Sequence, residues 1–213
     1  NPDMIIWPET AYPYLVRSDN GGEEIRNTAK NTGVPILAGA VYSEDDIFYN
    51  AAILYSDKGE TKDKYFKMHL VPFGEYIPFG KHLSFVQTYI DKPIGDFRSG
   101  TKYVLFPIRS FVAGETDSGD IVRVSNFFKF GTLICFEDIF PYISREFVMS
   151  GAHFLVNITN DGWFGKSAAS RQHLQASVFR AVENRVPVVR SANTGISCFI
   201  DSTGEISSVR RRR

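Results

Sequence analysis

The chain has 213 residues, with 24 Lys and Arg against 24 Asp and Glu, so its formal net charge is zero. Hydrophobic residues make up 43% and charged residues 23%, values that are typical of a globular protein and exclude a disordered or low-complexity chain. The balanced charge gives no electrostatic reason to expect a nucleic acid as the main partner. Two cysteines cannot form a disulfide framework, and no apolar run approaches the roughly 18 residues of a membrane-spanning helix.

The first half of the chain predicts strands and one short helix. The apolar run Met4–Trp7 is typical of a buried strand that stops where a polar loop begins. Residues 22–33 favour an exposed helix that Gly33 closes. The segments Val34–Tyr42 and Tyr49–Tyr55 predict two further strands.

A long segment rich in Pro, Gly and aromatic residues follows, at about residues 70–101. About 30 residues without clear secondary structure exceed the usual length of a connection, and such segments often form functional lids. Phe73, Tyr76 and Phe79 lie in this lid-like loop and are candidates for substrate contact. Apolar side chains on a loop need a partner, which is either the domain itself or a molecule outside it.

The second half predicts a regular alternation of strands and helices. The expected elements are a strand at Asn126–Cys135, a helix at Tyr142–Gly151, a strand at Phe154–Thr159, a helix at Ser170–Arg185, and strands at Val186–Arg190 and Ser197–Asp201. In the second helix Leu174, Val178, Ala181 and Val182 repeat with helical spacing, which predicts its buried face. The alternation, without an internal repeat or a linker, predicts a single α/β domain over residues 1–213.

Cys135 is the first candidate for chemistry, because it ends an apolar strand and precedes the polar residues Glu137 and Asp138. A thiol at such a point is held rigidly and stays reachable, although a free Cys is more often a small buried hydrophobic residue. We expect Cys198, in the middle of a predicted strand, to be such a core residue.

A nucleophilic thiol needs a base or a cation close to it. Pairing with one of the four histidines is possible, but no spacing supports it. Lys67 ends a further expected strand at the mouth of the long loop, and Glu9 follows the apolar strand near the N-terminus. A carboxylate at such a position could accept the proton of the thiol. Each of the two could equally be a surface residue. Three strand-end residues of suitable types nevertheless predict a common site at one sheet edge.

The motifs around these three residues resemble those of the nitrilase (carbon–nitrogen hydrolase) superfamily, with its Glu-Lys-Cys triad. Within that superfamily they are similar to the apolipoprotein N-acyltransferases, a family of bacterial lipoprotein-maturing enzymes. The segments that carry the closer resemblance are His69–Pro78, Asn160–Gly165, Gln172–Leu174 and Arg190–Gly195. The resemblance extends from about Ile5 to Gly204 and implies a nitrilase-like α-β-β-α sandwich.

The resemblance also implies the chemistry. Cys135 would attack a phospholipid ester to form a thioester, and the α-amine of a diacylglyceryl-cysteine on an apolipoprotein would then take the acyl chain. Glu9 would be the general base, and Lys67 would stabilise the oxyanion together with the backbone N–H after Cys135. Glu75 would support Lys67 or Glu9. No cofactor and no metal site are implied.

Four more positions belong to the expected site. Glu137 matches an acidic position of the family with a structural or supporting use, and Phe136 replaces a Tyr of many relatives and so lacks its hydroxyl group. Trp163 and Phe164 lie between two glycines and form either an exposed wedge over the site or a core plug.

Enzymes of this kind have membrane-spanning helices before and after the catalytic domain. We therefore expect a fragment, truncated at both ends, of an enzyme whose catalytic domain lies on the periplasmic face of the bacterial inner membrane. Arg210–Arg213 are expected to be a frayed end and are given no role. Two alternatives stay open: a soluble nitrilase-type amidase or carbamoylase that hydrolyses a small amide, and a catalytically inactive binding domain.

Overall fold

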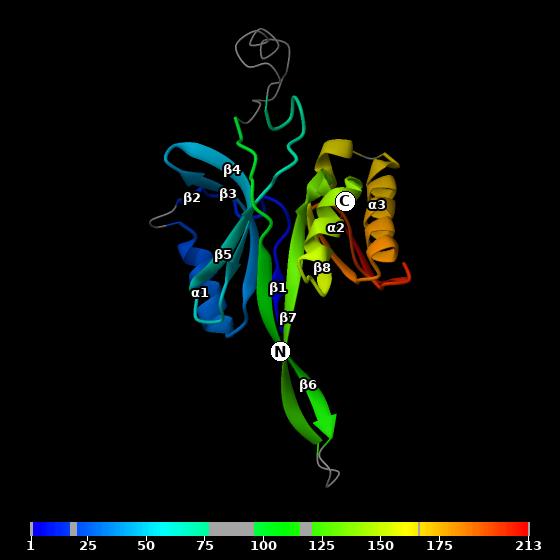
Figure 1. Cartoon of the computed structure of the whole chain (residues 1–213). Coiled ribbons are helices and arrows are strands. Elements are labelled where there is room, and N and C mark those ends of the chain that lie inside the picture. The colour runs from blue at the N-terminus through cyan, green and yellow to red at the C-terminus, as the bar shows by residue number, and fades with distance from the viewer. Residues whose placement is uncertain (1, 18–20, 77–95, 116–120, 166, 213) are drawn as a thin grey trace.

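The computed structural model describes residues 2–17, 21–76, 96–115, 121–165 and 167–212. For residues 111–115, 121–124, 163 and 212 it describes the backbone alone. Within these ranges the chain forms two mixed β-sheets with helices on their outer faces (Figure 1).

The first sheet contains strands from the N-terminal third of the chain. They are β1 (Ile5–Ile6), β2 (Val16–Arg17), β3 (Ile36–Glu44), β4 (Ile47–Tyr55) and β5 (Thr61–Phe66). β1 and β2 both pair with β3 in parallel, whereas β3 with β4 and β4 with β5 are antiparallel. β1, β3 and β5 therefore run in the same direction, and their carboxyl ends lie at the same edge of the sheet.

The second sheet has the order β11-β10-β9-β8-β7-β6. Its strands are β6 (Leu105–Glu115), β7 (Ile121–Ile134), β8 (Phe154–Thr159), β9 (Val188–Ala192), β10 (Gly195–Ile200) and β11 (Ile206–Arg212). β7, β8 and β9 are parallel neighbours, and the remaining pairs are antiparallel. The carboxyl ends of β7 and β8 consequently meet at one edge.

Helices cover the outside of both sheets. α1 (Glu23–Thr32) packs on the first sheet through Ile25 and Ala29. On the second sheet lie α2 (Pro141–Met149) and α3 (Ala169–Asn184), together with the short 3₁₀-helices η2 (Cys135–Ile139) and η3 (Asp161–Phe164). The layer order is the α-β-β-α sandwich that the sequence predicts.

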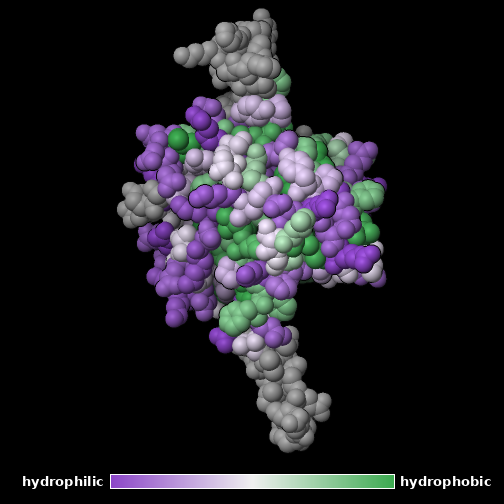
Figure 2. All heavy atoms as spheres, in the orientation of Figure 1, coloured by the Kyte–Doolittle hydropathy of each residue, from purple (hydrophilic) through white to green (hydrophobic). Residues whose placement is uncertain are grey.

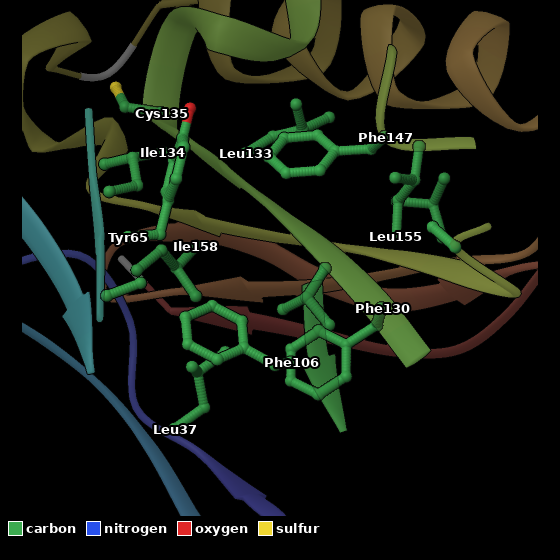
Figure 3. Close-up of a cluster of buried hydrophobic side chains, with 14 of the residues drawn as sticks. Leu37, Tyr65, Phe106, Phe130, Leu133, Ile134, Cys135, Phe147, Leu155 and Ile158 are labelled. Carbon is green, nitrogen blue, oxygen red and sulfur yellow. The ribbon is translucent and has the colours of Figure 1, made fainter. Parts of the chain in front are cut away.

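The main core lies between the two sheets. Leu37 and Tyr65 of the first sheet belong to the same buried cluster as Phe106 and Phe130 of the second (Figure 3). On the outer face of the second sheet, a Cβ at Gly131 would lie 2.4 Å from the ring of Phe147. Only glycine therefore allows α2 to approach β7 this closely.

One face of the molecule shows this division in its hydropathy (Figure 2). Hydrophobic residues gather along the middle of the face, over the junction of the two sheets, and hydrophilic residues lie on both sides of it. Among the described helices, none has the length and apolar character needed to cross a membrane.

Most predicted elements are confirmed, with four corrections. Cys135 is the first residue of η2 and not the last of a strand. β6 was not predicted, because Pro107 interrupts its pattern; it pairs with β7 over the whole of its length. The C-terminal arginines were expected to be frayed, but Arg210 and Arg211 lie in β11, which pairs with β10.

The fourth correction concerns α3, whose buried face is largely polar. Its buried residues include His173, Ser177 and Arg180, whereas the side chain of Val182 is 43% exposed. The apolar spacing alone therefore misplaced part of this face, since the helix also packs on buried charged groups of the second sheet.

Candidate active site

Glu9, Lys67 and Cys135 follow β1, β5 and β7, and the structure brings all three together where these strands end. They are almost fully buried, with 6%, 1% and 7% of their surface exposed. A pocket of about 230 Å³ opens between them. The carboxyl ends of strands from both sheets thus place a carboxylate, an ammonium group and a thiol around one small cavity.

A close approach of two backbone segments positions Glu9. A Cβ at Gly39 of β3 would lie 2.1 Å from the carbonyl oxygen of Pro8, so this contact requires glycine. The Glu9 carboxylate accepts hydrogen bonds from Asn50 Nδ2 at 2.8 Å and from the backbone N–H of Asn160 at 2.9 Å. Glu9 is therefore held from both sheets.

Lys67 lies between two carboxylates. Its Nζ is 2.9 Å from Glu75 and 3.6 Å from Glu9. Burial disfavours the ammonium form, but the nearby acidic groups, Glu9 first, outweigh it and raise the pKa of Lys67 above its usual value. Lys67 consequently carries a positive charge inside the pocket at neutral pH.

Cys135 has an unusual backbone conformation for a non-glycine residue, with φ at 53°. Its carbonyl oxygen accepts a hydrogen bond from Asn157 Nδ2 at 3.1 Å, which helps to fix the turn. Its side chain leaves the core cluster, with the sulfur pointing away from Leu133 and Phe147 (Figure 3). Burial, followed by the negative charge of Glu9, raises the pKa of the thiol to about 12. The resting group is therefore a thiol, which needs a base to become a nucleophile.

Two further glutamates have distinct places. Glu75 bonds Lys67 Nζ, Asn50 Nδ2 and the backbone N–H of Val71, so it holds the lysine at the mouth of the long loop. Glu137 is fully buried and accepts hydrogen bonds from the Tyr65 hydroxyl and from three backbone N–H groups, those of Met68, His69 and Ile134. Glu137 thus connects the segment after Lys67 to the turn at Cys135 without facing the pocket.

Aromatic side chains form the other walls of the pocket. Phe97, Phe136 and Phe164 line it, and the rings of Phe136 and Phe164 lie 5.8 Å apart. A larger depression of about 580 Å³ lies elsewhere, next to Pro35 and Arg109, and its described lining contains neither a cysteine nor a histidine. The smaller pocket, which contains the thiol, the ammonium group and the carboxylates, is therefore the candidate active site.

The lid candidates are described only in part. Phe73 is 45% exposed and has a left-handed backbone, and Tyr76 closes the same turn through its carbonyl, which accepts the N–H of Phe73. Phe79 lies outside the described residues. So does the side chain of Trp163, although its backbone belongs to η3.

Sequence reasoning missed Asn50, which donates to Glu9 and Glu75 and lines the pocket. A polar residue within the apolar run of β4 was the available signal. It also missed the buried charged groups beneath Cys135, which include His173 and Arg190. Among the described residues, His173 approaches the carbonyl oxygen of Cys135 and not its thiol, and no three His, Cys, Asp or Glu side chains are arranged to hold a metal ion.

The sequence is similar to those of known protein families. A family model described as carbon-nitrogen hydrolase matches residues 2–211. Curated proteins from several bacteria named apolipoprotein N-acyltransferase match most of the chain. The protein from Geobacter metallireducens is 42% identical over 209 residues, which are 96% of this chain and 37% of that protein. The chain thus spans a little over a third of the length of these relatives.

Solved structures show the same fold at low identity. A carbon–nitrogen hydrolase superfamily protein from Xanthomonas campestris superimposes with a TM-score of 0.68 at 18% identity, covering 99% of this chain and 74% of that one. A mutant amidase from Nesterenkonia sp., described with an acetamide moiety added covalently at its active-site cysteine, gives a TM-score of 0.61 at 16% identity, with coverages of 96% and 71%.

Proposed function

The chain belongs to the carbon–nitrogen hydrolase family, and on that premise we propose that it is the catalytic domain of an N-acyltransferase. This enzyme moves an acyl chain from a phospholipid, through a thioester on Cys135, to the N-terminal diacylglyceryl-cysteine of an apolipoprotein. The observation that carries the proposal is the buried set Glu9, Lys67 and Cys135 around one pocket, in a chain 42% identical to a protein named apolipoprotein N-acyltransferase.

In the first half of the reaction, the Cys135 sulfur attacks the carbonyl carbon of the phospholipid ester. Glu9 takes the thiol proton as the S–C bond forms, which the high pKa of the thiol requires. Lys67 and the backbone N–H of Phe136 stabilise the oxyanion. The ester C–O bond then breaks, and Glu9 returns the proton to the leaving alcohol of the lysophospholipid.

In the second half, the neutral α-amine of the acceptor attacks the thioester carbon. Glu9 takes one proton from the amine as the C–N bond forms, and the C–S bond breaks. The proton passes to the Cys135 sulfur, so the enzyme returns to its first state and no oxidant or reductant is consumed. The acetamide moiety described as covalently added at the active-site cysteine of the Nesterenkonia amidase supports a nucleophilic role for the cysteine.

The lining of the pocket supports transfer in preference to hydrolysis. Cys135 is 7% exposed, and Val71, Phe97, Phe136 and Phe164 surround the cavity with apolar surface. Such a lining favours an acyl chain and disfavours water, which would otherwise hydrolyse the thioester. On this proposal the enzyme acts at the bacterial inner membrane, with the domain on the periplasmic face.

The test uses the intact protein in phospholipid vesicles, with Cys135→Ala and, as the matched control, Cys198→Ala. Cys198 is buried in β10, away from the pocket. Mass spectrometry should find an acyl adduct on the wild type and on Cys198→Ala, and none on Cys135→Ala. A diacylglyceryl-cysteine lipopeptide added afterwards should remove the adduct and gain one acyl chain.

Two results would contradict the proposal. A folded wild type that forms neither adduct nor acylated lipopeptide would exclude catalysis by Cys135. Release of free acid or ammonia from a small amide, without transfer to the lipopeptide, would instead support an amidase.

A further inference from the structure

A cluster of buried charged side chains lies directly beneath the nucleophile. Asp138 of η2, Asp161 of η3, His173 of α3 and Arg190 of β9 each have at most 4% of their surface exposed. Arg190 bonds both aspartates at 3.1 Å. Four charges at one place in a core are costly unless each is paired, so the cluster needs a reason beyond stability.

His173 has a carboxylate at each ring nitrogen. Nε2 lies 2.9 Å from Asp138 Oδ1, and Nδ1 lies 2.8 Å from Asp161 Oδ1. A carboxylate oxygen this close to a nitrogen requires a hydrogen between them, so both nitrogens donate and the ring is an imidazolium. Arg190 Nη2, 3.0 Å from Nδ1, converges on the same Asp161 oxygen.

The charges around His173 agree with this protonation state. Burial and the Arg190 guanidinium lower its pKa, but the hydrogen bonds to Asp138 and Asp161 outweigh them and raise the pKa to about 9. With His173 and Arg190 positive, the two aspartates are balanced. Two uncharged rings also contact it: Phe136 stacks on it at 5.2 Å and Phe164 meets it edge-on at 6.0 Å.

The two aspartates belong to the two segments that form the pocket. Asp138 is in the turn that begins at Cys135, and His173 Nε2 also lies 3.3 Å from the Cys135 carbonyl oxygen. Asp161 directly follows Asn160, whose backbone N–H binds Glu9. His173 therefore connects the segment that carries the nucleophile to the segment that anchors the base.

This connection bears on a strained element. A non-glycine residue with φ at 53° costs about 1–3 kcal/mol and persists only where its surroundings fix it. The Cys135 carbonyl lies within hydrogen-bonding distance of two donors, Asn157 and His173. Loss of one of them would leave the thiol free to shift relative to Glu9.

We propose that His173 is a positioning residue for the chemistry at Cys135: its imidazolium, held between Asp138 and Asp161, keeps the thiol and Glu9 in register. The inference rests on Cys135 being the nucleophile, as proposed above.

The experiment measures how fast Cys135 is acylated in the intact protein, with p-nitrophenyl butyrate as the probe. The burst of p-nitrophenol should fall about 100-fold in His173→Gln, the scale expected when a reacting group shifts by about 1 Å, with KM within about twofold of wild type. His173→Gln combined with Asp161→Asn restores a neutral hydrogen-bonded bridge and a balanced charge, so it should recover most of the rate. In ¹⁵N-histidine-labelled protein, both ring nitrogens of His173 should be protonated at pH 7.5.

Phe106→Ala is the control for a merely structural effect, because Phe106 lies in the core between the sheets and does not line the pocket. It should lower the melting temperature at least as much as His173→Gln and leave the burst rate within about twofold. A His173→Gln burst within about threefold of wild type, a neutral His173 at pH 7.5, or a double variant as slow as the single one would each overturn the inference. A wild type acylated by p-nitrophenyl butyrate but not by phospholipid would contradict the proposed function and leave this inference standing.

Discussion

At the scale of single residues, the pocket contains two carboxylates, one ammonium group and one thiol. The carboxylates of Glu9 and Glu75 face the same lysine, and Asn50 Nδ2 donates to both of them at 2.8 Å. Asn50 Oδ1 is buried and has no hydrogen-bond partner among the described residues. The side-chain amide of Asn50 thus donates hydrogen bonds that hold the two like-charged carboxylates of Glu9 and Glu75 in place.

Replacing Asn50 by Leu should reduce the rate of acyl-enzyme formation. Both carboxylates lose a donor in a buried place, and hydrogen bonds to charged groups contribute about 1.5–3 kcal/mol, so we expect about a 10- to 100-fold loss in rate. The measurement is the acylation rate of the intact protein with phospholipid. Asn27→Leu, at an exposed position of α1, is the control and should stay within about twofold. An Asn50→Leu variant as fast as the control would show that Lys67 and the backbone N–H groups of Asn160 and Val71 are enough to hold the two carboxylates.

At the scale of elements, the site depends on how closely strands and loops approach one another. The β1 segment reaches the pocket only because Gly39 leaves room for the Pro8 carbonyl, and the β7 turn is tied to the end of β5 through Glu137. The strands β3, β4 and β8 could be predicted from their apolar patterns. The second part of β7 could be predicted too, but β6 and the first part of β7 could not, because their long pairing depends on a partner strand rather than on local sequence.

Gly39→Ala should both displace Glu9 and lower the free energy of unfolding. The added Cβ would lie 2.1 Å from a backbone oxygen that cannot rotate away, and overpacking of this kind costs about 1–3 kcal/mol. The free energy of unfolding and the acylation rate should both fall. Gly74→Ala is the control for the free energy of unfolding, since its Cβ would meet Val71 at an ordinary 3.6 Å. Equal behaviour of the two variants would show that the β1 segment can relax without loss.

At the scale of the whole molecule, the candidate active site joins two sheets that are otherwise connected by an apolar core. Glu9 and Lys67 come from the first sheet, and Cys135 and Asn160 come from the second. The buried charged cluster ties η2, η3, α3 and β9 together beneath the site. His173 therefore belongs both to the buried core of the molecule and to the contacts around Cys135.

Stability should decline as pH rises through the pKa of His173. Its folded pKa of about 9 exceeds the usual 6.5, so its contribution is fully present below pH 6.5 and is lost as pH rises through about 9. The difference corresponds to about 3 kcal/mol. Unfolding of the intact protein between pH 6.5 and 9 should show this decline in the wild type and a much flatter dependence in His173→Gln. Parallel curves for the two proteins would contradict the assignment.

The sequence by itself determined the fold class, the positions of most strands and helices, and the three residue types that follow strands at Glu9, Lys67 and Cys135. These features are local, because the patterns that form strands, helices and the loops after them depend on residues that are close together in the sequence. Only the tertiary structure decided that the three side chains share one pocket, that Asn50 bridges two carboxylates, and that two aspartates flank His173 and raise its pKa. Those features depend on contacts between distant segments, where burial and the charges of non-neighbouring residues set geometry and protonation.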